Sequence, residues 1–236
     1  MLPRANSFAL NRVERMILDP IFIVVSLISL VLGITIHEFA HALSADLLGD
    51  PTPRYQGRLT LNPVAHFDPI GGLMILVSSI SGFGFGWGKP VPVNPANLRY
   101  GPRVGLALVS FAGPFSNIVV ATLFAAPLRI ASLQGIPFPG ILGFILVAII
   151  TTNVALAVFN LFPLHPLDGF SVLRGILSTI RARWAYDAST LMDRMQVYGP
   201  MIFMAVIFID QILPGRGIIW TVLGPIYDLL LKVILG

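Results

Sequence analysis

Long apolar stretches alternate with short polar connections along most of the chain. Four of them approach or exceed the about 20 apolar residues that a helix needs to cross a bilayer; they cover residues 20–48, 104–132, 139–163 and 197–235. The last stretch is interrupted at Pro214-Gly215-Arg216-Gly217, so we expect a helical hairpin or two tilted short helices there. The pattern therefore predicts a protein that crosses a membrane several times.

A fifth apolar run, residues 70–80, is too short to span a membrane comfortably and is typical of a re-entrant or interfacial segment. It lies in a region rich in proline and glycine, residues 49–102, where residues 55–62 and 89–94 are candidate strands. Prolines restrict the second candidate to the edge of a sheet. The expected fold is an all-α multi-pass helical bundle, with a re-entrant segment and short β elements between the first two membrane helices.

We expect a single domain in three parts. Residues 1–19 lack the apolar core of a signal peptide and suit a short interfacial arm. Residues 20–196 would form the membrane core. Residues 197–236 would add a C-terminal transmembrane hairpin that belongs to the same domain.

The composition agrees with a bilayer as the solvent. Hydrophobic residues make up 56% of the 236 residues and charged residues 11%, whereas a soluble domain carries about 25% charged residues. The net charge of +4 comes from basic residues between the apolar stretches. There they set topology and contact anionic headgroups, which argues against nucleic acid as a partner. The absence of cysteine excludes thiolate metal sites and cysteine nucleophiles.

The strongest chemical signal is the segment His37-Glu38-Phe39-Ala40-His41 in the first apolar stretch. Two histidines four residues apart share one face of a helix and can bind one metal ion. Glu38 is placed to take a proton from a metal-bound water. In a soluble helix the same pattern would be a polar surface patch as often as a metal site. In a membrane helix each ionisable group costs roughly 2.5–3.5 kcal/mol, and a bound cation compensates that cost.

A catalytic zinc site needs a third protein ligand besides two histidines and a water. Candidates are few, because His66, His165 and Glu14 are the remaining histidines and glutamate. Asp168 is the best candidate, since it follows the third apolar stretch after helix-breaking prolines; an ordinary turn aspartate before glycine explains it equally well. Asp168 lies on the same side of the membrane as the histidines if residues 70–80 do not cross.

Five motifs, spread over roughly residues 33–175, resemble the site-2 protease family of intramembrane zinc proteases. They are HEFAH at 37–41, LNPVAHFDPIG at 61–71, FGWGKPVPVNPANLR at 85–99, AGPFSN at 112–117 and NLFPLHPLDG at 160–169. Five motifs in this order are far more specific than the two-histidine segment alone. Without a PDZ-like insertion, the chain is similar to the compact members of that family.

The resemblance implies a zinc ion (Zn2+) held by His37, His41 and Asp168, with Glu38 as the general base. It also implies that Asn160 positions the substrate or stabilises the oxyanion, a task that suits a carboxamide donor. Packing between helices is the alternative role for Asn160.

Three more polar residues have plainer explanations. Asn117, in the AGPFSN motif, suits an interhelical hydrogen bond. His165 stands where many members of the family have proline, and a tolerated residue is favoured over a role next to the ligands. For His66 the default is a hydrogen bond within its loop.

The expected function is that of a zinc metalloendopeptidase that hydrolyses peptide bonds in or near the transmembrane segments of membrane-protein substrates. The unwound substrate would add as a strand to residues 55–62 or 89–94. The alternative is a non-catalytic membrane metal-binding protein, either a pseudoprotease or a metal carrier. Glu38 argues against the alternative, because such a site needs ligands but no base.

The basic residues also predict an orientation in the cell membrane. The expected crossings place ten of the 15 lysines and arginines on the face of the zinc site and five on the other. The ten are Arg54, Arg58, Lys89, Arg99, Arg103, Arg174, Arg181, Arg183, Arg194 and Lys232, and the five are Arg4, Arg12, Arg15, Arg129 and Arg216. Cytoplasmic loops collect basic residues, so the zinc site is expected to open toward the cytoplasm, with the N-terminus outside.

Overall fold

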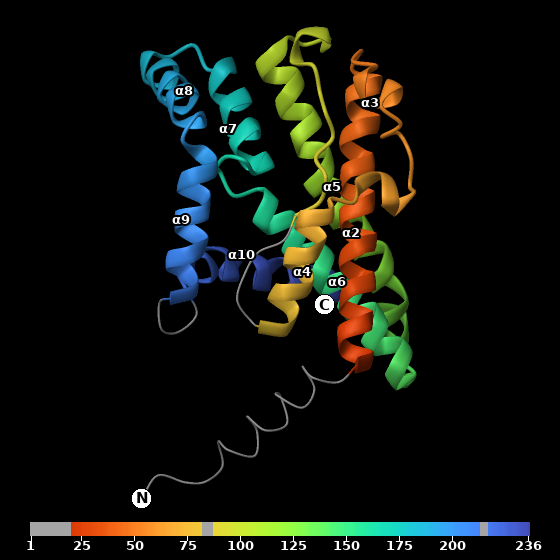
Figure 1. Cartoon of the computed structure of the whole chain (residues 1–236). Helices are drawn as coiled ribbons and strands as arrows, with labels where there is room; N and C mark the ends of the chain where they lie inside the picture. Colours follow the sequence, from red (N-terminus) through yellow and green to blue (C-terminus); the bar gives the residue numbers. More distant parts are fainter. Residues whose placement is uncertain (1–19, 82–86, 213–216) are drawn as a thin grey trace, which may run out of the picture.

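The computed structural model describes residues 20–81, 87–212 and 217–236; the arm expected over residues 1–19 lies outside these ranges. Every regular element within them is a helix (Figure 1). Four are long and apolar enough to cross a membrane, namely α2 (Pro20–Leu47), α5 (Pro102–Leu133), α6 (Gly140–Asn160) and α10 (Ile218–Leu235). The prediction of an all-α multi-pass membrane protein is confirmed.

The remaining helices are shorter. They are α3 (Thr52–Tyr55), the 3₁₀ helices η1 (Pro63–His66) and η2 (Pro95–Asn97), α4 (Pro69–Ser81), α7 (Asp168–Thr179), α8 (Arg183–Gln196) and α9 (Gly199–Ile212). With 13 residues, α4 is too short to be a candidate span. Helix α9 reaches the length of a span only together with α8, from which it is bent by 79°.

The prediction of short strands is wrong for the described residues. Residues 55–62 leave α3 through a turn at Gly57, whose φ is 66°. Residues 89–94 join no ladder, because Pro90 and a second proline two residues later have no N–H to donate. The buried guanidinium of Arg58 instead donates to the carbonyl oxygens of Lys89 and Pro90. Side chains satisfy this backbone, and no neighbouring strand is needed.

Helices α2, α5 and α6 form the bundle that carries the site. Figure 1 shows α2 and α6 running in the same direction and α5 running in the opposite direction, and each of the three helices packs against the other two. After α6 the chain turns and α7 continues toward the end of the molecule where α2 ends. Small residues allow close packing, since a Cβ at Gly33 would lie 2.6 Å from Leu156 Cδ1. These directions bring the start of α7 level with the middle of the bundle.

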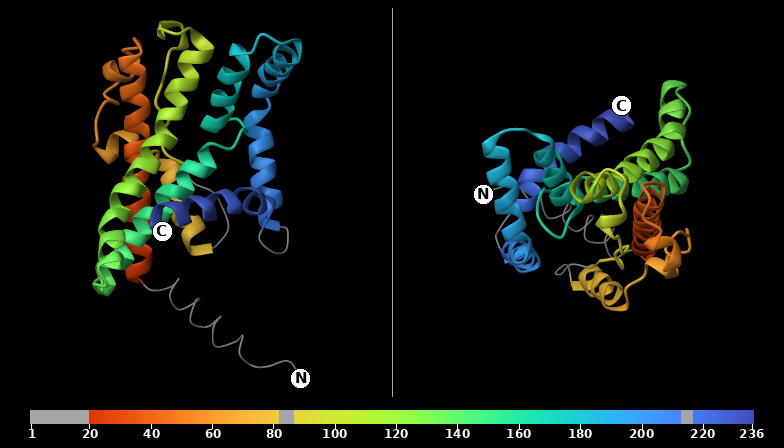
Figure 2. Two further views of the ribbon diagram at one scale, coloured as in Figure 1. Left: turned by 180° about the vertical axis from the view of Figure 1, so that it is seen from behind. Right: turned by 90° about the horizontal axis from the view of Figure 1, so that it is seen from above.

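Helix α10 lies across the bundle and not alongside α9, as both views in Figure 2 show. Its Leu223 and Ile234 pack into the core formed by α5 and α6, which includes Ala121 and Val154. The carboxylate of Asp210, near the end of α9, accepts a hydrogen bond from Ile219 N at 2.7 Å. Helices α9 and α10 therefore correspond to the predicted pair of tilted short helices and do not lie antiparallel to each other as in a helical hairpin.

Candidate functional site

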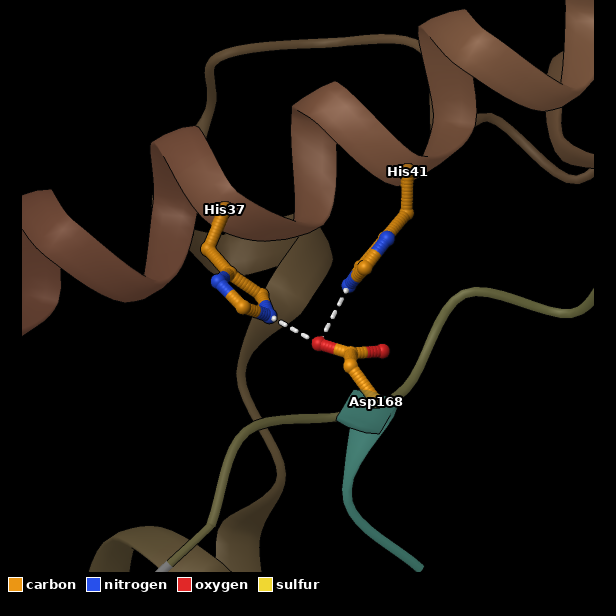
Figure 3. A group of neighbouring side chains, drawn as sticks. All are labelled: His37, His41 and Asp168. Carbon is orange, nitrogen blue, oxygen red and sulfur yellow. Dashed lines mark ion pairs between the residues drawn. The ribbon is translucent and has the colours of Figure 1, made fainter. Parts of the chain in front are cut away.

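His37, His41 and Asp168 converge at the junction of α2 and α7 (Figure 3). The two histidines lie one turn apart on the buried face of α2. Asp168 Oδ2 is 3.0 Å from His37 Nε2 and 3.3 Å from His41 Nε2. One nitrogen or oxygen from each residue lies within 4.8 Å of the others. The structure thus brings together the three residues that the sequence suggested as metal ligands.

Asp168 reaches the histidines because the chain turns sharply after α6. Helix α6 ends at Asn160, and Asp168 is the first residue of α7. Gly169 is required for this turn, because a Cβ there would lie 2.1 Å from the carbonyl oxygen of Leu161. A second close approach occurs at Gly113 on α5, where a Cβ would lie 2.5 Å from the ring of His41. Two glycines therefore make room for the cluster.

The other ring nitrogen of each histidine faces an oxygen. His41 Nδ1 lies 2.8 Å from the carbonyl oxygen of Val109, and His37 Nδ1 lies 2.7 Å from Asn117 Oδ1. These oxygens accept hydrogen bonds, so a neutral imidazole keeps its proton on Nδ1 and turns the Nε2 lone pair toward Asp168. With both rings neutral, three electron-rich atoms this close together repel one another unless a metal cation or a proton lies between them. The donor set fits zinc, which takes imidazole and carboxylate ligands.

The charge of Asp168 supports this fit. Burial raises the pKa of its carboxyl, but His41 and His37, when they are protonated, outweigh burial by their charge and hydrogen bonds and hold that pKa well below its usual range. The carboxylate is therefore ionised at neutral pH and is available as a ligand.

Glu38 lies beside the cluster and is held by the segment that follows residues 82–86. Its Oε2 accepts a hydrogen bond from Val91 N at 3.0 Å. Arg58 also holds this segment in place, because its guanidinium donates to the carbonyl oxygens of Lys89 and Pro90. The Arg58 residue is buried, with 4% of its surface exposed. A base next to a metal site needs a fixed position within reach of the reacting proton. The loop provides that position.

A cavity of about 430 Å³ adjoins the cluster, lined by His37, Glu38 and Asn160 together with mostly apolar side chains. Asn160 Nδ2 donates to the carbonyl oxygen of Leu156 at 2.9 Å, which uses one of the two amide hydrogens. Helix α9 contributes to the far wall, including Phe203. All five residues proposed from the sequence therefore lie in the cluster or line the adjoining cavity.

The remaining histidines lie away from the cluster. His66 Nε2 donates to the carbonyl oxygen of Thr60 at 2.8 Å, which is a hydrogen bond within its loop. His165 packs edge-on against Phe170, with ring centroids 5.4 Å apart. Burial and the charge of Arg174 lower the pKa of His165. Neither residue belongs to the metal-binding group among the described residues.

Sequence reasoning missed two groups that support the site. Asn153 on α6 is completely buried and accepts a hydrogen bond from Asn117 at 2.8 Å. A polar side chain in so apolar a helix is itself a signal of function. Val91 N–H, the partner of Glu38, left no such signal, because nothing in the sequence indicates which backbone groups meet across 53 residues.

Comparisons with known proteins agree with these observations. Residues 125–203 match peptidase family M50. The chain is 36% identical over 212 residues to YwhC of Bacillus subtilis, covering 87% of this chain and 89% of that protein. It is 32% identical over 151 residues to Rip2 of Mycolicibacterium smegmatis, covering 60% of this chain and 53% of that protein. Both relatives are named "Putative zinc metalloprotease". No solved structure matches the chain.

Proposed function

Because the chain belongs to peptidase family M50, the site-2 protease family, and is an integral membrane zinc metalloprotease, we propose that it hydrolyses peptide bonds in or near the transmembrane segments of other membrane proteins. The observation that carries this proposal is the convergence of His37, His41 and Asp168 beside Glu38, at the wall of a largely apolar cavity.

In this proposal His37, His41 and Asp168 hold the zinc ion through two imidazole nitrogens and one carboxylate oxygen. Zinc bound in this way supplies a Lewis acid that polarises a carbonyl and lowers the pKa of water. The protein's own contribution is geometric. The three ligands come from α2 and α7, which both pack against α5, and both Nδ1 protons are already committed to oxygens.

Glu38 acts as the general base that takes the proton of the attacking water and returns it to the leaving amine. The hydrogen bond from Val91 N–H holds one carboxylate oxygen at 3.0 Å and leaves the other for that proton. Asn160 lines the same cavity, and its second amide hydrogen is available to donate to the developing oxyanion.

The cavity favours an apolar substrate. Leu156, Phe159, Phe203 and Met204 contribute to its lining, and they suit the side chains of a transmembrane segment. A substrate helix hides its peptide bonds in its own hydrogen bonds, so it must unwind locally before cleavage.

We further propose that the zinc site opens toward the cytoplasm. Residues 70–80 form a helix too short to cross the membrane, so α4 is re-entrant in the proposed topology. In this topology α7 lies on the same side of the membrane as the C-terminal end of α2. Arg129 Nη1, on the other face, donates to the carbonyl oxygen of Val233 at 3.1 Å, so Lys232 belongs with Arg129. Nine of the 15 basic residues, instead of the expected ten, then lie on the cytoplasmic face. Single cysteines at Ser7 and Ser178 test this in intact cells with a membrane-impermeant reagent. Labelling at residue 178 alone would show that the zinc site faces the outside of the cell. Labelling at both residues would show that the proposed number of membrane crossings is wrong.

The decisive experiment on function compares the wild-type protein with Glu38→Gln on a model transmembrane substrate in proteoliposomes. Glutamine keeps the shape but cannot take the proton, so cleavage should fall by about 10²–10⁴-fold while the zinc content stays at one per chain. Asp187→Asn, on the exposed side of α8, is the matched acid-to-amide control.

Two results would count against the proposal. Near wild-type cleavage by Glu38→Gln would exclude Glu38 as the base. If the wild-type protein binds zinc but cleaves no membrane substrate of varied sequence, the alternative of a pseudoprotease or metal carrier is favoured. Retention of Glu38 beside the ligands is the observation that argues against this alternative.

A further inference from the structure

Asn117 on α5 and Asn153 on α6 are both completely buried, in a part of the bundle where unpaired polar groups are costly. Asn117 Nδ2 donates to Asn153 Oδ1 at 2.8 Å, and Asn117 Oδ1 faces His37 Nδ1 at 2.7 Å. We infer that the two asparagines form a relay that fixes the tautomer of His37, so that the Nε2 lone pair of His37 stays directed at the metal. Both are positioning residues, since they act through His37.

Two backbone carbonyls determine the direction of the relay. Asn153 Nδ2 lies 2.8 Å from the carbonyl oxygen of Ile149, which can only accept, so Asn153 must turn its Oδ1 toward Asn117. Asn117 Nδ2 also lies 3.1 Å from the carbonyl oxygen of Gly33 on α2. Both hydrogens of the Asn117 amide are therefore committed to oxygens, on α2 and on α6.

The amide of Asn117 cannot flip without placing its oxygen against two other oxygens. Its Oδ1 is consequently fixed toward His37 as an acceptor, and His37 must donate from Nδ1. With the proton held on Nδ1, the neutral ring has its lone pair on Nε2, which lies 3.0 Å from Asp168 Oδ2. The relay extends from the core of α6 to the metal site through three side chains.

His41 shows why His37 needs this support. The partner of His41 Nδ1 is the carbonyl oxygen of Val109, a backbone group that accepts in any orientation. The partner of His37 is a side-chain amide, which presents an oxygen at one end and hydrogens at the other. A flipped Asn117 would donate to His37 Nδ1 and would move the imidazole proton to Nε2, where it would block a metal. Asn153 and Gly33 O prevent that flip.

This inference rests on the proposed function, because it takes His37 to be a ligand. The experiment measures zinc affinity of the full-length protein in detergent, by competition with a chromophoric chelator, and the visible spectrum of the cobalt-substituted protein. The variants are Asn117→Leu, Asn117→Asp, Asn153→Leu and His37→Ala. Thr35→Val is the matched control, since it removes a buried hydroxyl that bonds only to its own helix, at Val31 O.

Changes in the groups that orient metal ligands typically cost about 10–100-fold in metal affinity. Asn117→Leu should show a loss in this range and an altered cobalt spectrum. Asn117→Asp should lose less affinity than Asn117→Leu, because a carboxylate still accepts the hydrogen from His37, although its second oxygen faces the oxygens of Gly33 and Asn153. Asn153→Leu should have a smaller loss, since Gly33 O still holds the amide. Thr35→Val should bind zinc as the wild type does.

Each other outcome is decisive. If Asn117→Leu lowers the melting temperature of the zinc-free protein but binds zinc with wild-type affinity, the amides only join helices and the relay is refuted. If Asn117→Leu does not fold, Asn153→Leu decides, and wild-type zinc affinity together with an unchanged cobalt spectrum in that variant overturns the relay. Unchanged zinc binding in His37→Ala would instead refute the proposed metal site, independently of the asparagines.

Discussion

On one side of the site, α2 carries the two histidines, α7 carries Asp168, and α5 and α6 carry the asparagines behind His37. On the other side, residues 87–94 have no regular structure before η2 begins, and residues of this segment and of α9 line the cavity. We call the first side the ligand wall and the second the pocket wall. Helices satisfy their own backbone hydrogen bonds, so the polar side chains of the ligand wall are available to orient one another and the metal ligands.

The pocket wall has the reverse arrangement, because there the side chains satisfy the backbone. Arg58 donates to the carbonyl oxygens of Lys89 and Pro90, and Asp50 accepts from Asn94 N at 2.7 Å. Prolines in the same segment remove further N–H groups that would need partners. Irregular backbone in a membrane protein is tolerated where the protein itself satisfies it. The buried charges of Arg58 and Asp50 therefore satisfy the backbone of the pocket wall, as helical hydrogen bonds satisfy the backbone of the ligand wall.

The largest effect is expected from the ligand wall, with Asp168→Ala. Loss of the carboxylate leaves two imidazoles whose geometry no longer fits a three-ligand zinc site. Zinc affinity should fall by more than the about 10–100-fold caused by changes behind the ligands, and cleavage should be lost with it. Metal analysis of the purified protein measures the first effect. Full zinc occupancy in Asp168→Ala would remove Asp168 from the ligand set and direct attention to His66 and His165.

A smaller effect on the same wall is expected from Gly113→Ala. The added methyl would lie 2.5 Å from the ring of His41 and 2.7 Å from that of His37, so the rings must move and zinc affinity should fall by about tenfold or more. Gly143→Ala on α6 is the control, because its Cβ would meet only Phe138, at 3.6 Å. Zinc affinity unchanged in Gly113→Ala would show that α5 yields and that the ligand wall is less rigid than its packing suggests.

Much of the ligand wall could be predicted from the sequence. The stretches expected at 20–48, 104–132 and 139–163 correspond closely to α2, α5 and α6, because a bilayer fixes the length of an apolar helix. The spacing of His37 and His41 places both on one helical face. Asp168 was a candidate because it follows helix-breaking prolines, and the resemblance to the site-2 protease family implied it as the third ligand. The helices and the histidine pair depend on local periodicity, and the third ligand depends on the family resemblance.

The pocket wall could not be predicted in the same way. Residues 89–94 were a candidate strand that their prolines restricted to the edge of a sheet, but the side-chain partners of this backbone are Arg58, Glu38 and Asp50. They lie 31 to 53 residues away in the chain, and one sequence does not indicate such pairings. Asn153 was missed for a different reason. Its position in an apolar helix marked it as unusual, but only the packing of three helices shows that it contacts Asn117.

The pocket wall should respond to Arg58→Met in activity but not in zinc content. Methionine keeps most of the buried stem and removes the donors to the carbonyl oxygens of Lys89 and Pro90, so the segment that holds Glu38 loses its support. Hydrogen bonds to charged groups are worth about 1.5–3 kcal/mol each, and we expect cleavage to fall several-fold. Arg54→Met is the control, since the Arg54 side chain is exposed and donates to no backbone carbonyl of residues 87–94. A loss of zinc in Arg58→Met would mean that the two walls are not independent.

The smallest effect concerns the pH dependence of the pocket wall through Asp50. Burial raises the pKa of Asp50, but hydrogen bonds from Thr52, Asn97 and Asn94 outweigh it and lower that pKa below its usual value. A carboxyl whose pKa is lower in the folded protein contributes stability above its unfolded pKa of about 4, and this stability is lost as the pH falls through the folded value. The melting temperature of the wild-type protein should therefore exceed that of Asp50→Asn at pH 7, and the gap should narrow below about pH 4.

Intrinsic tryptophan fluorescence in detergent, recorded for both proteins from neutral to acidic pH, measures this gap. The Asp187→Asn variant, on the exposed side of α8, corrects for the loss of one negative charge. Zinc must be removed first, because protonation of the metal ligands in the same pH range would otherwise release it and destabilise both proteins. A gap that stays constant across the range would show that the Asp50 carboxylate contributes by its shape and not by its charge. In that case, of the two buried charges, only that of Arg58 would support the pocket wall.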